Sequence, residues 1–407
     1  MVLLENKQNP RPMTEITNVA LIGSTSSEFS AGGTGSGDVE EAYSIALDDA
    51  LIKNGFEINK IALNEYLKQN SKNLKEKKDD AEIPGAIGVA MSMMNPYTPI
   101  KMEYSTKLLD EISATSDIAI VTIGRNSGES SDRVLSDDFL LSEKEKQMIK
   151  NTCEVFQSKG KKVIVILNVG GVIETSSWKN QPDAILLAWQ GGQEGGNSVV
   201  DILTGKVNPS GKLPMTFPID INDHKSSLNF PMDGEKLKLN DLIFGVDYDK
   251  PENKKIRNKD YTIYEEGIYV GYRHFDKDKI EVSYPFGYGM SYTNFKYSDL
   301  KITKQENKIN LSFKVQNIGG FKGKEITQVY ISKINSKIDR PIKELKGFSK
   351  TKLLESDESS ILDIEIPVSD FYYWNEKINS WDIENGEYSI QIGSSSRDIK
   401  LQEKIKI

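Results

Sequence analysis

One acidic residue, Glu129, follows a predicted β-strand at the end where α/β sheets bind ligands. Glu129 follows an apolar, β-branched run at 118–123 through a loop of small residues at 124–128. Such a run predicts a buried strand covered on both faces. Ligands of open α/β sheets bind at the carboxyl ends of the strands. A carboxylate at this place is either a solvated surface charge or a group that moves protons, and the pattern alone leaves both open.

Two charged residues come directly after Glu129. Asp132 and Arg133 could form an ion pair that holds this loop in place. An ordinary surface ion pair, which would contribute little, explains the same two residues equally well.

A second loop of interest follows the apolar run at 19–23. It is rich in glycine over 31–38 and carries Ser36. Neither of the two glycine motifs that bind nucleotide phosphates is present in it. Nucleotide binding is therefore not expected. A loop of this kind can instead bring backbone amides and the Ser36 hydroxyl close to a sugar.

The first half of the chain alternates between strand and helix patterns. Ser142 and Glu145 form a capping box that predicts a helix ending at Gly160. The expected helices are 40–54, 61–78, 108–114, 142–159 and one ending at 203, and further strands are expected at 162–168 and 184–189. This alternation predicts a mostly parallel, doubly wound α/β sandwich. The segment 79–98 has no clear periodicity and is either a loop over a cleft or a connector.

The second half of the chain differs in composition and periodicity. Proline, glycine and tyrosine dominate 208–292, which suggests a linker with aromatic anchors or, alternatively, a sugar-facing rim. Residues 295–407 alternate with period two between turn signals, which predicts a fibronectin type III-like β-sandwich. The expected domains are therefore an α/β sandwich at 1–218, an irregular linker at 219–294 and the β-sandwich at 295–407.

Composition narrows the function. The 407 residues carry a formal net charge of -8 with dispersed Lys and Arg, which argues against nucleic acid as a partner. The chain has only two His, which argues against a His-rich metal site, and its one Cys excludes an internal disulfide. No metal and no cofactor are expected. No apolar run approaches membrane length, so no membrane partner is expected and a cytoplasmic location is the default. Cys153, inside a predicted helix, is expected to serve packing.

Three stretches taken in order resemble the family 3 glycoside hydrolases, above all the thermostable type of bacterial β-glucosidase. The resemblance extends over nearly the whole chain and rests on the motifs at 124–133, at 188–197 with 205–218, and at 264–275 with 285–292. The family has a (β/α)8 barrel, an α/β sandwich and a fibronectin type III-like domain. This chain resembles the last two.

The resemblance implies roles for single residues. Glu129 matches the general acid/base, and Ser36 matches the serine that hydrogen-bonds the bound sugar. Related β-glucosidases offer an aromatic side chain to the leaving-group sugar from the long loop. Because no Trp lies between 79 and 98, Tyr97 or the Met residues there would take that place. Glu194 is the rival acid, although helix N-termini attract carboxylates for structural reasons.

The resemblance also implies an incomplete site. Retaining hydrolysis needs two carboxylates about 5 Å apart, and the family's nucleophile is an Asp on the barrel. This chain is therefore expected to be the acid/base-bearing portion of a retaining β-glucosidase, inactive alone. Its expected partners are a β-glucoside or small oligosaccharide and either a barrel chain or further copies of itself. The alternatives are a fragment of a β-xylosidase-type enzyme and a non-catalytic sugar-binding or scaffold protein.

Overall fold

The computed structural model describes residues 1–7, 13, 16–33, 39, 41–79, 99–126, 135–229 and 263–407, with side chains left out at 74–79 and 228–229. These residues form two compact units. The first consists of residues 1, 3–207 and 226–264, and the second of residues 2, 208–225 and 265–407. Each unit has its own sheets and its own core.

The first unit is built on one six-stranded sheet, whose strands lie in the order β1-β6-β5-β4-β2-β3. The pairs from β3 through β2, β4 and β5 to β6 are parallel. Every residue of β4 is buried, as expected of a strand covered on both faces. The strands are β1 Val2–Asn6, β2 Asn18–Ile22, β3 Glu57–Ile58, β4 Ile118–Arg125, β5 Lys162–Val169 and β6 Ala184–Leu187.

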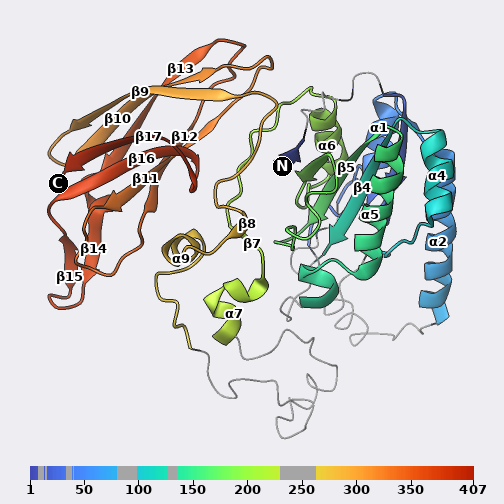
Figure 1. Ribbon diagram of the computed structural model, residues 1–407, viewed down its shortest axis with the longest axis horizontal. Helices are drawn as coiled ribbons and strands as arrows, with labels where there is room; N and C mark the ends of the chain where they lie inside the picture. Colours follow the sequence, from blue (N-terminus) through green and yellow to red (C-terminus); the bar gives the residue numbers. More distant parts are fainter. Residues whose placement is uncertain are drawn as a thin grey trace, which may run out of the picture. The chain divides into compact units, whose positions relative to one another are not determined.

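Helices cover both faces of this sheet (Figure 1). Helices α1 and α6 pack on each other at one face, and α4 packs on α5 and α2 at the other. The helices are α1 Leu47–Lys53, α2 Lys60–Asp79, α4 Thr106–Ala114, α5 Glu143–Ser158 and α6 Gly195–Leu203, with short turns η1 Ser24–Ser26 and η3 Leu135–Phe139. The predicted capping box is confirmed, since the Ser142 hydroxyl accepts from the Glu145 amide and the Glu145 carboxylate accepts from the Ser142 amide.

One predicted helix begins later than its apolar spacing indicated. The pattern predicted a helix from residue 40, but α1 begins at Leu47, after Ala46 in an extended conformation. The reason is a tertiary contact. The Ile45 amide donates to the Gln193 carbonyl and the Gly196 amide donates to the Ile45 carbonyl, both near 3 Å (2.8 and 3.0 Å). These hydrogen bonds need extended backbone, and they override the local helical preference.

The second unit is a β-sandwich. One sheet has the strand order β13-β10-β9 and the other β12-β11-β16-β17, and buried apolar side chains from both form a single core. Burial alternates along β10, as the period-two pattern predicted. Its strands are β9 Phe295–Lys304, β10 Lys308–Asn317, β11 Ile326–Lys333, β12 Glu344–Lys350, β13 Ser359–Pro367, β14 Tyr372–Asn375, β15 Ser380–Ile383, β16 Glu387–Ser395 and β17 Asp398–Lys406. An α/β fold plus an all-β fold is confirmed.

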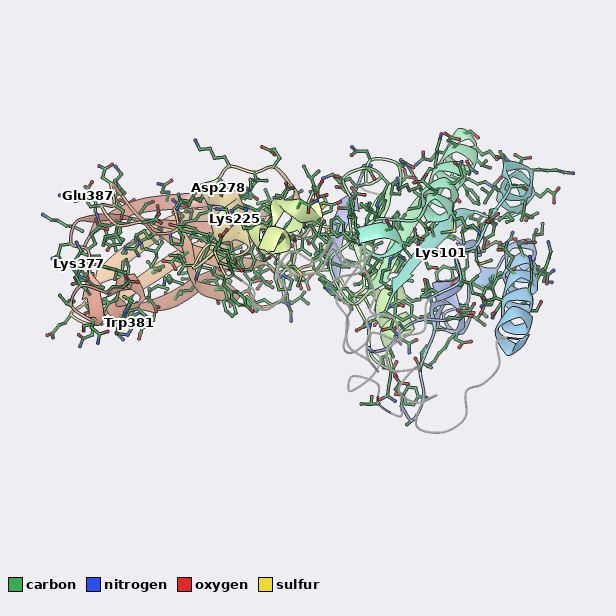
Figure 2. The ribbon with its side chains drawn as sticks, turned by 90° about the horizontal axis from the view of Figure 1, so that it is seen from below. Lys101, Lys225, Asp278, Lys377, Trp381 and Glu387 are labelled. Carbon is green, nitrogen blue, oxygen red and sulfur yellow. The ribbon has the colours of Figure 1, made fainter. Side chains whose placement is uncertain are left out.

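A joining segment completes the second unit. Strands β7 (Phe217–Pro218) and β8 (Val282–Tyr284) pair antiparallel, and the Leu213 amide donates to the Tyr288 carbonyl at 2.8 Å. Lys225, the first residue of α7 (Lys225–Asn229), pairs at 3.2 Å with Asp278, which follows α9 (Tyr272–Lys277) (Figure 2). Short turns are η4 Ile221–Asp223 and η6 Val368–Phe371. The aromatic segment thus packs within this unit, where Tyr272 stacks on Phe286 with ring centroids 4.8 Å apart.

Candidate active site

The strand order of the first unit has its switch point between β2 and β4. From β2 the chain proceeds outward to β3, and it then returns to the other side of β2 as β4. Ligands of such sheets bind outside the carboxyl ends of the strands at the switch point. The segment with Ser36 follows β2 and the segment with Glu129 follows β4, so the two leave the sheet from neighbouring strands.

The predicted site side chains lie outside the described residues. This holds for all five of them: Ser36, Tyr97, Glu129, Asp132 and Arg133. What the structure describes is the scaffold from which their segments start and to which they return.

Gly124 in β4 packs very closely against Thr25 and against Pro99, the residue that follows the segment 80–98. A Cβ atom added to Gly124 would lie 2.2 Å from Thr25 Cγ2 and 2.9 Å from Pro99 Cγ, so only glycine fits there. The Ser24 hydroxyl donates to the Ile100 carbonyl at 3.1 Å. The chain therefore comes back from the segment with Tyr97 at the same sheet edge that the other two segments leave.

A buried amide connects three parts of this edge. Asn168, near the end of β5, is 0% exposed. Its Oδ1 accepts from the Ser30 amide at 2.7 Å, and its Nδ2 donates to the carbonyls of Ser30 at 3.0 Å and Trp189 at 2.8 Å. Both ends of the side-chain amide are thus satisfied, as burial requires. Asn168 fixes the position of the loop after β2 relative to β5 and the end of β6.

Arg125, the last residue of β4, makes the strongest polar contact at the edge. Its Nη1 and Nη2 donate to the two carboxylate oxygens of Glu145 at 2.6 and 2.9 Å, and its Nε donates to the Asp138 carbonyl at 2.9 Å. Glu145 also accepts from the Ser142 amide at the start of α5. Both charged side chains are more than nine-tenths buried. The residues before and after 127–134 are therefore held to one another by a buried, bidentate ion pair.

The loop after β6 contributes two further polar groups. The side-chain Nε2 of Gln190 donates to Asn126 Oδ1 at 3.1 Å, which links this loop to the residue after β4. Trp189 beside it has a φ of 58°, a left-handed conformation that non-glycine residues adopt at a cost. Strained backbone persists where the surrounding structure determines it, and it clusters at functional sites.

Glu194 is a poor proton donor. It precedes α6, and its carboxylate accepts from Tyr43 Oη at 2.7 Å and Asn197 Nδ2 at 2.5 Å. The hydrogen bond from Asn197, followed by that from Tyr43, lowers the pKa of Glu194. A carboxyl group with a lowered pKa is ionised near neutrality, so it cannot protonate a leaving group there. The structural role expected for it at a helix N-terminus is the better explanation.

Other chemistry is limited within the described parts of the chain. Over these residues no cluster of three His, Cys, Asp or Glu side chains could hold a metal ion. Burial raises the pKa of the Cys153 thiol to about 12, which suits the packing role predicted for it. None of the described helices has the length and apolar character needed to cross a membrane.

Sequence reasoning missed Asn168, Gln190 and the Arg125–Glu145 pair. A signal for Asn168 was present, since it is a polar residue at the end of an apolar strand, as Arg125 is in β4. The rule that points to Glu129 also points to these residues. Their partners, however, lie far away in sequence and could not be read from it.

Comparisons with known proteins agree with this architecture. Residues 1–272 match the glycosyl hydrolase family 3 C-terminal domain, and residues 325–396 match a fibronectin type III-like domain. Beta-glucosidase A of Butyrivibrio fibrisolvens is 34% identical over 452 residues, with 98% of this chain and 49% of that protein covered. Thermostable beta-glucosidase B of Acetivibrio thermocellus is 31% identical over 412 residues, with 100% and 47% covered.

A solved structure supports the same conclusion. Beta-glucosidase 3B of Thermotoga neapolitana, in complex with α-D-glucose, is similar with a TM-score of 0.83 and 38% identity, over 100% of this chain and 52% of that one. The chain thus spans about half the length of the relatives it matches. It belongs to glycoside hydrolase family 3, of which it carries the C-terminal domain followed by the fibronectin type III-like domain.

Proposed function

We propose that this chain supplies the general acid/base, Glu129, of a retaining β-glucosidase that releases terminal β-D-glucosyl residues. One observation carries the proposal: the segments with Glu129 and Ser36 start from β4 and β2, the neighbouring strands at the switch point of the sheet. This is the place where α/β sheets bind their ligands. Ser36 would hydrogen-bond the sugar, and Tyr97 would contact the leaving group.

The chemistry assigns Glu129 two steps. As an acid it protonates the glycosidic oxygen while a second carboxylate attacks the anomeric carbon. As a base it then takes a proton from the water that hydrolyses the glycosyl-enzyme. The resemblance places the attacking Asp on a barrel domain, and this chain spans only about half of the relatives' length. We therefore propose that this chain is inactive alone and acts together with a barrel domain. That domain would belong either to a partner chain or to another part of a longer protein.

The described scaffold supports this role of Glu129. Arg125 and Glu145 hold both ends of the segment 127–134, and Asp132 with Arg133 would hold the segment itself. An acid that works near neutrality needs a raised pKa, which burial or a second carboxylate can provide. Both would come from closure against the barrel, so the proton on Glu129 depends on assembly.

The decisive experiment joins this chain to the barrel half of the Acetivibrio thermocellus relative and measures hydrolysis of aryl β-glucosides. Glu129→Gln should lower the rate with a poor leaving group by about 10²–10⁴, the usual contribution of general acid/base catalysis. Added azide should restore turnover of an activated substrate and yield glucosyl azide, because azide needs no general base. Glu194→Gln is the matched control and should keep most of the activity.

Two results would contradict the proposal. One is a fused enzyme in which Glu129→Gln is as active as the parent while Glu194→Gln is inactive. The other is enzyme-like hydrolysis by the purified chain alone that Glu129→Gln abolishes, since no second carboxylate from a barrel would then be needed. A fused enzyme that binds glucosides and never hydrolyses them would favour the non-catalytic sugar-binding alternative.

A second specificity has its own support. The exo-alpha-(1->6)-L-arabinopyranosidase of Bifidobacterium longum is 33% identical over 290 residues, with 71% of this chain covered. A pyranosidase that acts on a five-carbon sugar is thus among the relatives, and a β-xylosidase-type activity is the second candidate. A comparison of kcat/KM for nitrophenyl β-D-glucoside, β-D-xyloside and α-L-arabinopyranoside on the fused enzyme decides between them.

A further inference from the structure

A pocket of about 480 Å³ opens in the second unit. Two of the motifs that carry the family resemblance build it, since Lys212 lies in 205–218 and Tyr288 and Met290 lie in 285–292. The sandwich contributes Tyr297, Glu325 and Asp398. The pocket is in the size range of sites for small molecules. It lies in a different unit from the candidate active site.

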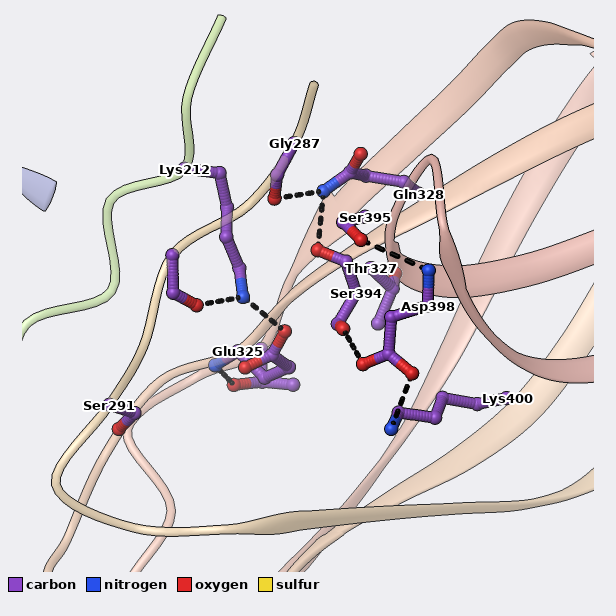
Figure 3. A network of polar contacts seen from close by, with 12 residues as sticks. Lys212, Gly287, Ser291, Glu325, Thr327, Gln328, Ser394, Ser395, Asp398 and Lys400 are labelled. Atoms are coloured by element: carbon purple, nitrogen blue, oxygen red, sulfur yellow. Dashed lines mark hydrogen bonds and ion pairs between the residues drawn. The ribbon is translucent and has the colours of Figure 1, made fainter. Parts of the chain in front are cut away.

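One wall of the pocket holds a buried carboxylate. Glu325 is 5% exposed, and its Oε1 lies 3.0 Å from Lys212 Nζ and accepts from Tyr297 Oη at 3.2 Å. Lys212 also donates to the Gly289 carbonyl at 2.9 Å (Figure 3). An ionised carboxylate has about four acceptor sites, so Glu325 can also accept a hydrogen bond from a bound donor.

A second carboxylate stands at the rim. Asp398 Oδ2 accepts from the Ser394 hydroxyl at 2.5 Å, and Oδ1 lies 2.8 Å from Lys400 Nζ. The Asp398 amide donates to the Ser395 hydroxyl at 3.1 Å, so the turn that carries this carboxylate is itself held in place (Figure 3).

The charges of the pocket select a neutral ligand. Each carboxylate already has a lysine partner, so an ionic ligand would have to compete with one of these pairs. A neutral polyol can donate to the carboxylate oxygens and accept from the ammonium groups without breaking either pair. Aromatic side chains of Tyr288, Phe295 and Tyr297 line the same space, and their faces can pack against the C–H groups of a sugar ring.

We propose that this pocket is a second carbohydrate site, which binds a neutral pyranose through Glu325, Asp398 and the aromatic lining. The site is independent of Glu129 and needs no catalysis. It would hold the enzyme near sugar-rich material or bind a released monosaccharide, and either use requires only weak binding.

Met290 lines the pocket and provides a local probe for the test. Methyl-¹³C labelling of Met yields a reporter at the pocket, and Met102 and Met148, which are buried in the first unit, serve as controls. Titration with D-glucose should shift the Met290 methyl signal along a saturating curve, with a Kd on the order of millimolar. Asp398→Asn should weaken this binding by about tenfold, since a hydrogen bond to a charged group is lost.

The matched control is Glu365→Gln, which removes an exposed carboxylate of β13 that pairs with Lys308 at 2.6 Å. It should leave the Met290 titration unchanged. Glu325→Gln should weaken binding as well, and if that variant fails to fold, the near-isosteric Asp398→Asn decides. The proposal is overturned by a shift that does not saturate, by an unchanged Kd in Asp398→Asn, or by tighter binding of D-glucuronate than of D-glucose.

Discussion

Arg125 and Glu145 face each other through two parallel hydrogen bonds of 2.6 and 2.9 Å, in a part of the first unit where both are more than nine-tenths buried. Arg125 ends β4, and Glu145 lies in the first turn of α5. The contact therefore joins the two elements between which the proposed acid/base lies in sequence.

Breaking this pair should be costly. Arg125→Met leaves the Glu145 carboxylate buried without its partner, which we expect to destabilise the chain by about 3–5 kcal/mol in urea unfolding. Lys146→Met is the control, because it breaks an exposed pair with Glu143 and should cost less than about 1 kcal/mol. Equal losses from the two substitutions would show that the buried pair has no special importance.

Gly124→Ala tests the close packing at the sheet edge. The new methyl group would meet Thr25 Cγ2 at 2.2 Å, so we expect a loss of about 1–3 kcal/mol. Thr25→Ser removes that Cγ2 atom and should recover part of the loss in the double variant. Gly320→Ala, where no atom lies within 4 Å, is the control and should be nearly neutral. Thermal or urea unfolding gives the comparison, and the absence of rescue by Thr25→Ser would contradict it.

The hydrogen bonds of Asp117 should make the stability of the fold depend on pH. Its Oδ2 accepts from the amides of Asn18 at 2.8 Å and Thr17 at 2.9 Å, and the Asn18 bond is the larger cause of its lowered pKa. A lowered folded-state pKa stabilises the fold above the unfolded pKa, roughly 4, and this stabilisation is lost as pH falls through the folded value.

Asp117→Asn should therefore cost about 1 kcal/mol near neutrality, a small value because the carboxylate is exposed. The difference from the parent should shrink as the pH of the urea titration falls below about 4. Asp363→Asn on an exposed face of β13 is the control. A difference that stays constant down to the lowest pH would rule out this carboxylate as its source.

Cys153 should be protected from alkylation. It is the one Cys of the chain, it is 3% exposed, and burial raises the pKa of its thiol to about 12. Only opening of the fold exposes a reactive thiolate, so labelling by iodoacetamide should be about a thousandfold slower than in urea. Ser71→Cys, at an exposed position of α2, should react at once. Equal rates at the two cysteines would contradict the buried packing role.

The sequence predicted the fold class well because the strongest signals are local. The apolar runs of β4 and β5, the Ser142–Glu145 capping box and the alternation along β10 each involve neighbours in sequence, and the structure confirms all of them. The roles of Ser36, Tyr97, Glu129, Asp132 and Arg133 stay predictions, as do the domain limits at 218, 219–294 and 295.

Local patterns could not predict the features that depend on contacts between residues far apart in sequence. The start of α1 is set by hydrogen bonds between Ile45 and the loop before α6. Lys212 and Glu325 form their pair across more than a hundred residues, and each alone resembles an ordinary surface charge. The sequence shows which residue types are present, whereas only the fold shows which of them are buried.

The Asn168 side-chain amide has a consequence for how the loops at this sheet edge can vary. It fixes Ser30 and Trp189 through main-chain atoms, so the spacing of these loop ends does not depend on the side chains that the loops carry. Loops that start from so rigid a base can be exchanged or lengthened while the sheet stays intact. Evolution, or a designer, can therefore vary these loops without rebuilding the domain.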